Sequence, residues 1–271
     1  MSSRPEQDGL IFLRSGETRS FSAQTLMTPN PPNFDSIARI YRWAEYLSLG
    51  PLLVRTRNHF LPQLAPCRRA LVLGDGDGRF LARLLQQNHG LHALAVDTSA
   101  KMLHLLRQRC LSTVPGCGSR LNTLLASALL ISPETCHLDR SATASSLRAA
   151  ERPAGPSEFP PPRGTDLIIT HFFLDCFTQS EVDALTARIT AQVQPGTLWL
   201  LSDFAVPSAP LLRPLAALYI RALYFVFRLL TGLRTTQLPN PQAALTRAGF
   251  RRIARHTLLC GLLYTELWQR Q

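Results

Sequence analysis

The feature that most constrains the fold of this 271-residue chain is an apolar run that ends in three alternating glycines. Residues 70–73 are apolar and lead into Gly74, Gly76 and Gly78, and the next apolar residues have helical spacing: Phe80, Leu81, Leu84 and Leu85. This pattern predicts a buried strand that turns sharply into a helix. Glycine is needed where the backbone takes a positive φ, or where a ligand must approach without meeting a Cβ atom.

A second apolar run, residues 91–97, ends on a carboxylate. Asp97 follows Gly78 by 19 residues, and a strand, glycine loop, helix, strand and acid in this order form a nucleoside-binding half of a doubly wound sheet. The acid is then placed to accept hydrogen bonds from ribose hydroxyls. The spacing G-x-G-x-G differs from the G-x-G-x-x-G of dinucleotide enzymes. Asp75 and Asp77 would repel a phosphate by several kcal/mol, but they would suit a cationic ligand.

The glycine loop (residues 74–78) together with Asp97 resembles the cofactor site of class I S-adenosylmethionine-dependent methyltransferases. The resemblance implies an α/β fold: a doubly wound, Rossmann-like, seven-stranded sheet with an antiparallel C-terminal hairpin and helices on both faces. It implies S-adenosyl-L-methionine as the cofactor. The residues that it assigns to cofactor binding are Gly74, Asp75, Gly76, Asp77, Gly78, Asp97, Thr98, Met102, Ser127 and His171.

Two positions depart from the family pattern. The family usually carries an acid two residues before the first glycine, where this chain has Val72. Either Asp75 or Asp77 takes over that role, or the ammonium group of the cofactor is held less tightly. An acid also commonly follows the third strand and meets the adenine amine, where this chain has Ser127; its hydroxyl or the backbone would make that contact. A non-catalytic nucleoside-binding subunit of the same fold therefore stays an alternative.

Methyl transfer is an in-line displacement that depends mainly on positioning, and it needs a base only when the acceptor must lose a proton. Family members that methylate amide side chains or base amines carry (D/N)-P-P-(Y/F) after the fourth strand, whereas this chain has T-H-F-F at residues 170–173. We therefore do not expect that chemistry. His171 and Asp175 are the candidate catalytic residues, as a base for a hydroxyl or an acidic carbon. A structural role for each is the alternative.

The composition restricts the partners. The net charge is +11 and there are 29 basic residues, almost all arginine, but they are dispersed along the chain. Nucleic-acid-binding surfaces more often show basic clusters with aromatic residues between them, so a nucleic acid partner is disfavoured and an RNA methyltransferase is kept as an alternative.

The six cysteines form no C-x-x-C pair and show no metal-ligand spacing, which indicates no metal site and reduced, cytoplasmic thiols.

The chain divides into a polar, proline-containing extension at residues 1–32, predicted to be disordered, and a methyltransferase domain at residues 33–271. A proline-rich stretch at about 132–164 predicts a disordered insertion between the third and fourth strands. Strands are expected at residues 69–73, 121–126, 165–170 and 197–203, with a closing hairpin at 251–258 and 262–269. Ser99 is the expected N-cap of a helix that runs to Arg109.

An apolar helix is predicted from Leu211 to Thr231. Arg213, Arg221 and Arg228 fall within an arc of roughly 80° on it, and these charges make a membrane-spanning helix costly. A helix lying in a membrane interface, or a lid over an apolar acceptor, fits the pattern, and a buried cap or dimer helix is the alternative.

The location and sequence of this predicted helix are similar to those of ubiquinone/menaquinone-biosynthesis methyltransferases, as are the short segments at residues 34–41, 238–240, 248–250 and 261–264. This resemblance implies a small, apolar, quinone- or lipid-like acceptor methylated at oxygen or carbon. It also fits a cytoplasmic protein with peripheral membrane association.

Overall fold

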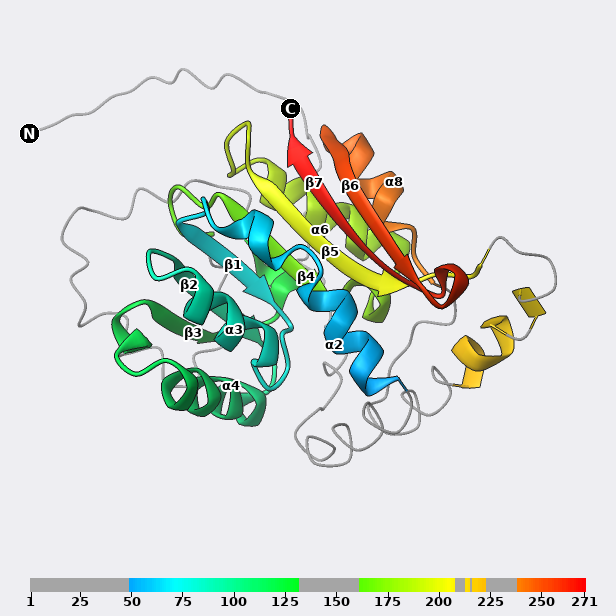
Figure 1. Ribbon diagram of the computed structural model, residues 1–271. Helices are drawn as coiled ribbons and strands as arrows, with labels where there is room; N and C mark the ends of the chain where they lie inside the picture. The colour runs from blue at the N-terminus through cyan, green and yellow to red at the C-terminus, as the bar shows by residue number, and fades with distance from the viewer. Residues whose placement is uncertain (1–48, 132–160, 208–212, 215, 223–237) are drawn as a thin grey trace, which may run out of the picture. The chain divides into compact units, whose positions relative to one another are not determined.

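A seven-stranded sheet organises the chain (Figure 1). The computed structural model describes residues 49–131, 161–207, 213–214, 216–222 and 238–271. The strand order is β3-β2-β1-β4-β5-β7-β6. The strands are β1 (Arg69–Leu73), β2 (His92–Asp97), β3 (Leu121–Leu125), β4 (Leu167–His171), β5 (Leu198–Phe204), β6 (Phe250–Leu258) and β7 (Leu263–Arg270).

Strands β1 to β5 are parallel to one another, whereas β7 is antiparallel to both β5 and β6. The order reverses at β1, which lies between β2 and β4. In open α/β sheets, ligands bind at the carboxyl ends of the strands near such a reversal. The seven strands and the antiparallel C-terminal hairpin confirm the predicted sheet, and each strand lies within a few residues of its expected place.

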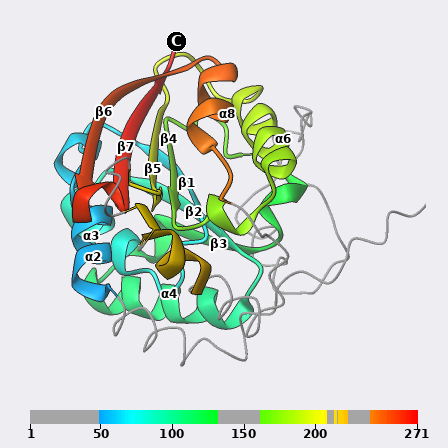
Figure 2. The same ribbon diagram turned by 90° about the vertical axis from the view of Figure 1, so that its right-hand side faces the viewer.

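Helices cover both faces of the sheet, as predicted (Figure 2). One face carries α3 and α4, and the other carries α6 and α8. The helices are α2 (Gly50–Asn58), α3 (Arg79–Gln87), α4 (Ala100–Thr113), α6 (Gln179–Thr190) and α8 (Pro241–Arg247). Short 3-10 turns that matter below are η3 (Ala128–Leu130) and η5 (Leu174–Cys176).

Alternating side chains of the strands build two hydrophobic cores. Ala70 and Val72 of β1 pack with α3 and α4, while Leu71 and Leu73 pack on the side of α6 and α8. Parallel strands that are buried on both faces are rich in aliphatic residues for this reason. Val72, at the position where the family carries an acid, is fully buried among apolar side chains, so a carboxylate there would lose its hydration without an evident partner.

Side-chain caps fix the starts of two helices. The Ser99 hydroxyl accepts the Met102 N–H at 3.2 Å, which confirms the predicted cap, although α4 continues past Arg109 to Thr113. Thr178 and Glu181 form a capping box, so α6 begins at Gln179.

A single carboxylate ties the start of β4 to the start of β1. The two oxygens of Asp166 accept the N–H groups of Arg68 and Arg69, both at 2.8 Å. Pro162 also accepts from the Thr165 backbone and hydroxyl. Residues 161–164 are thus part of the ordered approach to β4.

Several predictions concern residues outside the described ranges. These are the N-terminal extension (1–32), residues 132–160 of the insertion, and most of the helix from Leu211 to Thr231, including Arg228. Residues 213–214 and 216–222 of that segment are helical. In the described part of the chain, no helix is long and apolar enough to cross a bilayer, and none of the cysteines described there forms a disulfide.

Candidate active site

The three glycines of the loop between β1 and α3 have positive φ angles of 67°, 58° and 76° for Gly74, Gly76 and Gly78. A Cβ atom at Gly74 would lie 2.2 Å from the Phe173 ring, and one at Gly78 would lie 2.8 Å from the Leu106 Cα atom. At Gly76, no heavy atom of the described residues other than the adjacent ones lies within 4 Å of that position. The outer glycines therefore allow the protein to pack on itself, while the middle one borders open space.

The two acids of this loop are held by the protein's own groups. Asp75 accepts the Leu81 N–H at 3.1 Å and so caps the first turn of α3. Asp77 forms ion pairs with Arg79 at 3.1 Å and with Arg109 of α4 at 2.9 Å. Asp75 thus shapes the start of the helix, and Asp77 joins the loop to α4.

The ends of β2 and β3 bring Asp97 and Ser127 to the same edge. Asp97 Oδ1 accepts the Ser99 N–H at 2.9 Å, which orients the carboxylate, and the Asp97 carbonyl accepts the Ala126 N–H at 3.0 Å. Ser127 accepts the Leu129 N–H at 3.3 Å and caps η3. Next to Asp97, Thr98 is exposed, whereas Met102 is buried.

His171, the last residue of β4, lies beneath the loop and the start of α3. Its ring meets the Phe80 ring edge-on at 4.4 Å between centroids, and it is 2% exposed. Nδ1 lies 2.9 Å from the Ser202 hydroxyl, which donates to Thr265 at 2.8 Å. The Ser202 oxygen therefore accepts from Nδ1–H, and Nε2 carries a lone pair. Nε2 is buried, with no partner among the described residues.

The surroundings of His171 favour its neutral form. Burial, and to a lesser extent the positive charge of Arg57, hold the pKa of His171 well below its ordinary value of 6.5. The imidazole therefore enters any reaction near neutral pH as an uncharged base or a hydrogen-bond acceptor, and it contributes no positive charge.

Two carboxyl groups meet where β4 and β5 end. The Asp175 N–H donates to the Asp203 carboxylate, and Asp203 also accepts the Phe204 N–H at 2.8 Å. Burial, followed by the negative charge of Asp175, raises the pKa of Asp203 well above its ordinary value of 3.8. Burial and the charge of Asp203 likewise raise the pKa of Tyr264. Such a pair binds a proton more readily than an exposed carboxyl group does.

Aromatic rings border these acids. Phe172 has a positive φ of 51°, which is unusual for an aromatic residue and costs about 1–3 kcal/mol. Its N–H donates to the Ser202 carbonyl at 2.7 Å. Its ring lies 5.0 Å from the Phe204 ring, and the Arg57 guanidinium lies 5.1 Å from it. Sequence reasoning missed Phe172 and Phe204 as site residues, although the F-F pair after the fourth strand was a signal.

Known structures share this architecture, although neither a protein-family model nor a curated protein matches the sequence. The mitomycin 7-O-methyltransferase MmcR is 16% identical, with a TM-score of 0.56 over 88% of this chain and 61% of its own. An O-methyltransferase family 2 protein from Planctomyces limnophilus, in complex with apigenin, is 18% identical (TM-score 0.55; 86% and 62% covered). The pyocyanin biosynthetic protein PhzM is 13% identical (TM-score 0.55; 88% and 62%).

The fold is that of the class I methyltransferases. The chain spans about three fifths of the length of these three proteins. At these identities the likeness concerns the fold, so the chemistry has to be argued from the site itself.

The described residues fit the cofactor that this fold implies. S-adenosylmethionine carries a sulfonium and an ammonium group, and the edge that would receive it holds three carboxyl groups: Asp97, Asp175 and Asp203. The space at Gly76 lets a ligand approach the backbone, and the Asp97 carboxylate is oriented at the end of β2. The predicted residues of the glycine loop, Asp97 and Ser127 thus lie at adjacent strand ends, while His171 lies under the loop.

Proposed function

We propose that this protein is an S-adenosylmethionine-dependent methyltransferase that acts at oxygen or carbon of a small, apolar acceptor. The observation that carries the proposal is the open space at Gly76, in a loop whose other two glycines are closed off by Phe173 and Leu106. Other positive-φ glycines, such as Gly116, also border open space. Gly76 differs because it follows β1 at the strand ends where such sheets bind ligands, at the edge that also holds the oriented Asp97 carboxylate.

The chain's own residues would hold the cofactor in distinct ways. Asp97 accepts hydrogen bonds from the ribose hydroxyls, Met102 and Thr98 flank the adenine, and Ser127 or its backbone meets the adenine amine. Asp75 adds negative charge for the ammonium group, next to the backbone of Gly74, Gly76 and Gly78, whereas the expected alternative, Asp77, is engaged by Arg79 and Arg109. When bound, the cofactor supplies an electrophilic methyl group.

The acceptor would lie against the aromatic rings of Phe172 and Phe204. Their rings are tilted by 55° to each other and offer the acceptor an apolar surface. Asp175 is 9% exposed, whereas His171 is 2% exposed. We therefore place Asp175 first as the base that takes a proton from an acceptor hydroxyl, with Asp203 sharing that proton. His171 is the second candidate base, through Nε2.

Other findings support a small acceptor of this kind. The names of the structural relatives refer to the small molecules mitomycin and apigenin. The similarity of the predicted helix and four short sequence segments to quinone-biosynthesis methyltransferases favours a quinone- or lipid-like molecule. Peripheral membrane association through the segment from Leu211 to Thr231 would give access to such acceptors.

Calorimetric titration with S-adenosylhomocysteine tests the cofactor. Asp97→Ala should weaken binding about 10–100-fold, because charge-assisted hydrogen bonds contribute about 1.5–3 kcal/mol. Asp183→Ala is the matched control, since Asp183 pairs with Arg247 on the surface and should leave binding unchanged. Tight binding of NAD, with none of S-adenosylhomocysteine, would disprove the assignment.

Transfer of a labelled methyl group tests the acceptor. The protein is incubated with methyl-labelled cofactor and either a quinone and lipid extract or total RNA. Label in a small apolar product supports the proposal. Label in RNA alone, or binding of cofactor without transfer to either extract, would replace it with an RNA methyltransferase or a non-catalytic subunit, respectively.

A further inference from the structure

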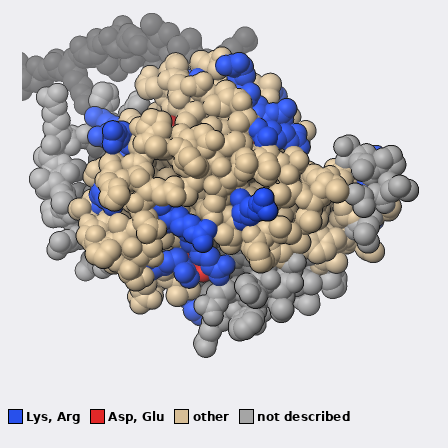
Figure 3. All heavy atoms as spheres, viewed as in Figure 1, with Lys and Arg blue, Asp and Glu red and all other residues tan. Residues whose placement is uncertain are grey.

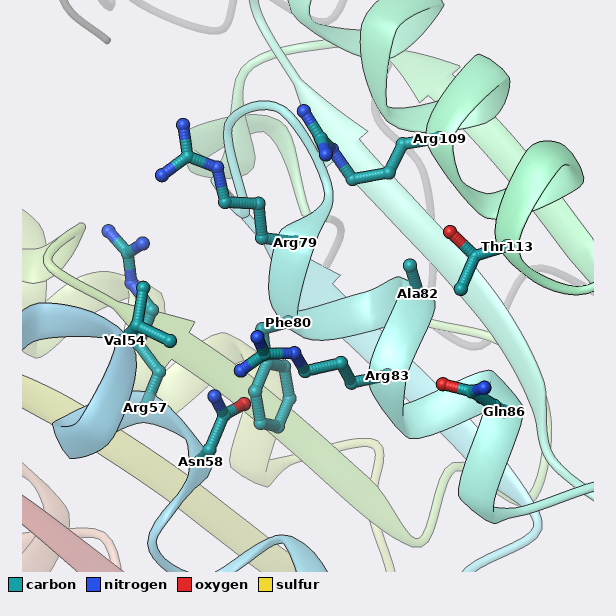
Figure 4. A pocket seen from close by; sticks show the side chains of 10 residues that line it. All are labelled: Val54, Arg57, Asn58, Arg79, Phe80, Ala82, Arg83, Gln86, Arg109 and Thr113. Carbon is teal, nitrogen blue, oxygen red and sulfur yellow. The ribbon is translucent and has the colours of Figure 1, made fainter. Parts of the chain in front are cut away.

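A cavity of about 230 Å³ lies between α2, α3 and α4 (Figure 4). Its α3 wall consists of the side of the helix that carries Arg79, Arg83 and Gln86, whereas Leu81, Leu84 and Leu85 of the same helix face the core. Residues of α2 and α4 complete it. None of the predicted cofactor-binding or catalytic residues lines it, so the proposed methyl transfer does not explain it.

The lining of this cavity is strongly basic. Four arginines from three helices surround it: Arg57, Arg79, Arg83 and Arg109. Figure 3 shows basic side chains gathered over α3 beside a small acidic spot. Asp77 forms ion pairs with two of the four arginines, Arg79 and Arg109. Because these two arginines share one carboxylate, the cavity keeps an excess of positive charge that attracts anions.

Arg83 and Asn58 show which contacts a ligand could make. Arg83 is exposed and makes no hydrogen bond or ion pair with the described part of the chain, and Figure 4 shows its side chain extending in front of Phe80 toward Asn58. The Asn58 Oδ1 atom is buried without a hydrogen-bond partner among the described residues. A buried acceptor of this kind carries an energetic cost until a donor reaches it.

Geometry and size limit the ligand. The guanidinium fork matches phosphate oxygens in bidentate fashion, and the unsatisfied Asn58 acceptor calls for a hydroxyl close to the anion. Pockets for drug-sized ligands measure about 300–1,000 Å³. This smaller cavity therefore suits a phosphate group with a few further atoms. We propose that it binds a small phosphate monoester that carries a hydroxyl group, with Arg83 on the phosphate and Asn58 on the hydroxyl.

Calorimetry at low salt, with glycerol 3-phosphate and inorganic phosphate as probes, tests this site. Arg83→Gln should weaken both probes about 10-fold. Asn58→Ala should weaken glycerol 3-phosphate and leave inorganic phosphate within about twofold. Arg107→Gln is the matched control, because Arg107 is an exposed arginine of α4 outside the cavity and its loss changes the net charge equally.

Each other outcome overturns the proposal. Equal losses in Arg83→Gln and Arg107→Gln would reveal unspecific attraction to the basic surface. No binding of either probe at millimolar concentration, or binding of RNA or anionic vesicles alone, would rule out a small-molecule site. Binding of S-adenosylhomocysteine by Arg83→Gln should stay unchanged, so a failure here remains separate from a failure of the proposed methyl transfer.

Discussion

Gly74, Gly76 and Gly78 share a backbone conformation but differ in what surrounds them. Any side chain at Gly74 or Gly78 meets Phe173 or Leu106, whereas the position of a Cβ atom at Gly76 is open. Gly74 and Gly78 are therefore required by packing, whereas Gly76 is a candidate requirement for ligand binding. Substitution can separate the two roles.

Gly76→Ala should cost about 1–2 kcal/mol of stability, because a left-handed conformation strains an L-residue, and it should weaken binding of S-adenosylhomocysteine at least tenfold. Gly116→Ala is the control, since Gly116 also has a positive φ and open space around its Cβ position, outside the site. It should lose similar stability and keep its affinity. Urea unfolding and calorimetry measure the two effects, and equal affinities of the variants would remove Gly76 from the site.

The buried His171 should make stability depend on pH. Its folded-state pKa lies well below 6.5, so below pH 6.5 the unfolded chain binds a proton that the folded protein does not accept. Stability is therefore lost as the pH falls below 6.5, with a slope of at most about 1.4 kcal/mol per pH unit. Urea unfolding at several pH values measures this slope.

His171→Gln isolates the contribution of this residue. Asp203 has a raised pKa and acts in the opposite direction, because the folded protein then binds a proton that the unfolded chain releases above pH 3.8. The wild type and the variant share the Asp203 effect, so their difference reports His171 alone. Identical slopes in the two proteins would show that the imidazole is hydrated in solution.

Local sequence indicated some site residues better than others. Asp97 and the glycines could be predicted because strand, loop and acid follow in a fixed order along the chain. The pairing of Asp77 with Arg109 could not, because 32 residues separate them and the contact depends on how α3 packs on α4. The positive φ of Phe172 was equally hidden, since its aromatic side chain favours a strand.

Among the elements, the β6–β7 hairpin depends on one buried carboxylate. Glu266 is fully buried and accepts from Arg252 at 2.9 Å, Trp268 at 3.0 Å and Gln242 at 3.1 Å. Arg255 lies 3.5 Å away. The resemblance to the class I methyltransferases predicted the hairpin, but it did not predict a charged residue facing inward from β7.

Glu266→Ala should destabilise the protein by about 2–4 kcal/mol, because the buried Trp268 N–H loses its acceptor. Arg255→Ala should cost less than about 1 kcal/mol, since its partly exposed guanidinium can be hydrated. Denaturant unfolding of both variants gives the comparison. A loss in Arg255→Ala as large as that in Glu266→Ala would mean that the ion pair, and not the buried acceptor, holds the hairpin.

Residues 132–160 should be dispensable for the fold. Replacing them with a short Gly/Ser linker while keeping residues 161–164, whose Pro162 accepts from Thr165, should change the melting temperature by less than about 2 °C. The reason is that closure entropy varies only with the logarithm of loop length. A drop of several degrees would show that this stretch packs against the domain.

At the scale of the whole molecule, the segment from Leu211 to Thr231 is the candidate for membrane contact. In its described part, Ala216 and Ile220 are buried, whereas Leu218 is 65% exposed. Replacing Arg213, Arg221 and Arg228 with Gln should lower binding to anionic liposomes about 100-fold, at about 1 kcal/mol per arginine. Co-sedimentation at low and high salt tests this, and wild-type protein that stays in the supernatant at low salt would refute it.

The position of β1 between β2 and β4 predicts the order in which these strands pair during folding. Ala70 pairs with Ala93, 23 residues away, and with Leu167, 97 residues away. Closing the longer loop costs about 1.3 kcal/mol more in conformational entropy. We therefore expect β1 to pair with β2 first and to keep its other edge unpaired until β4 docks. An unpaired, apolar strand edge favours aggregation with other chains. Asp166 accepts two backbone N–H groups at the start of β1, so it helps β4 to cover this edge. An Asp166→Ala substitution should therefore lower the yield of refolding more than it lowers the final stability.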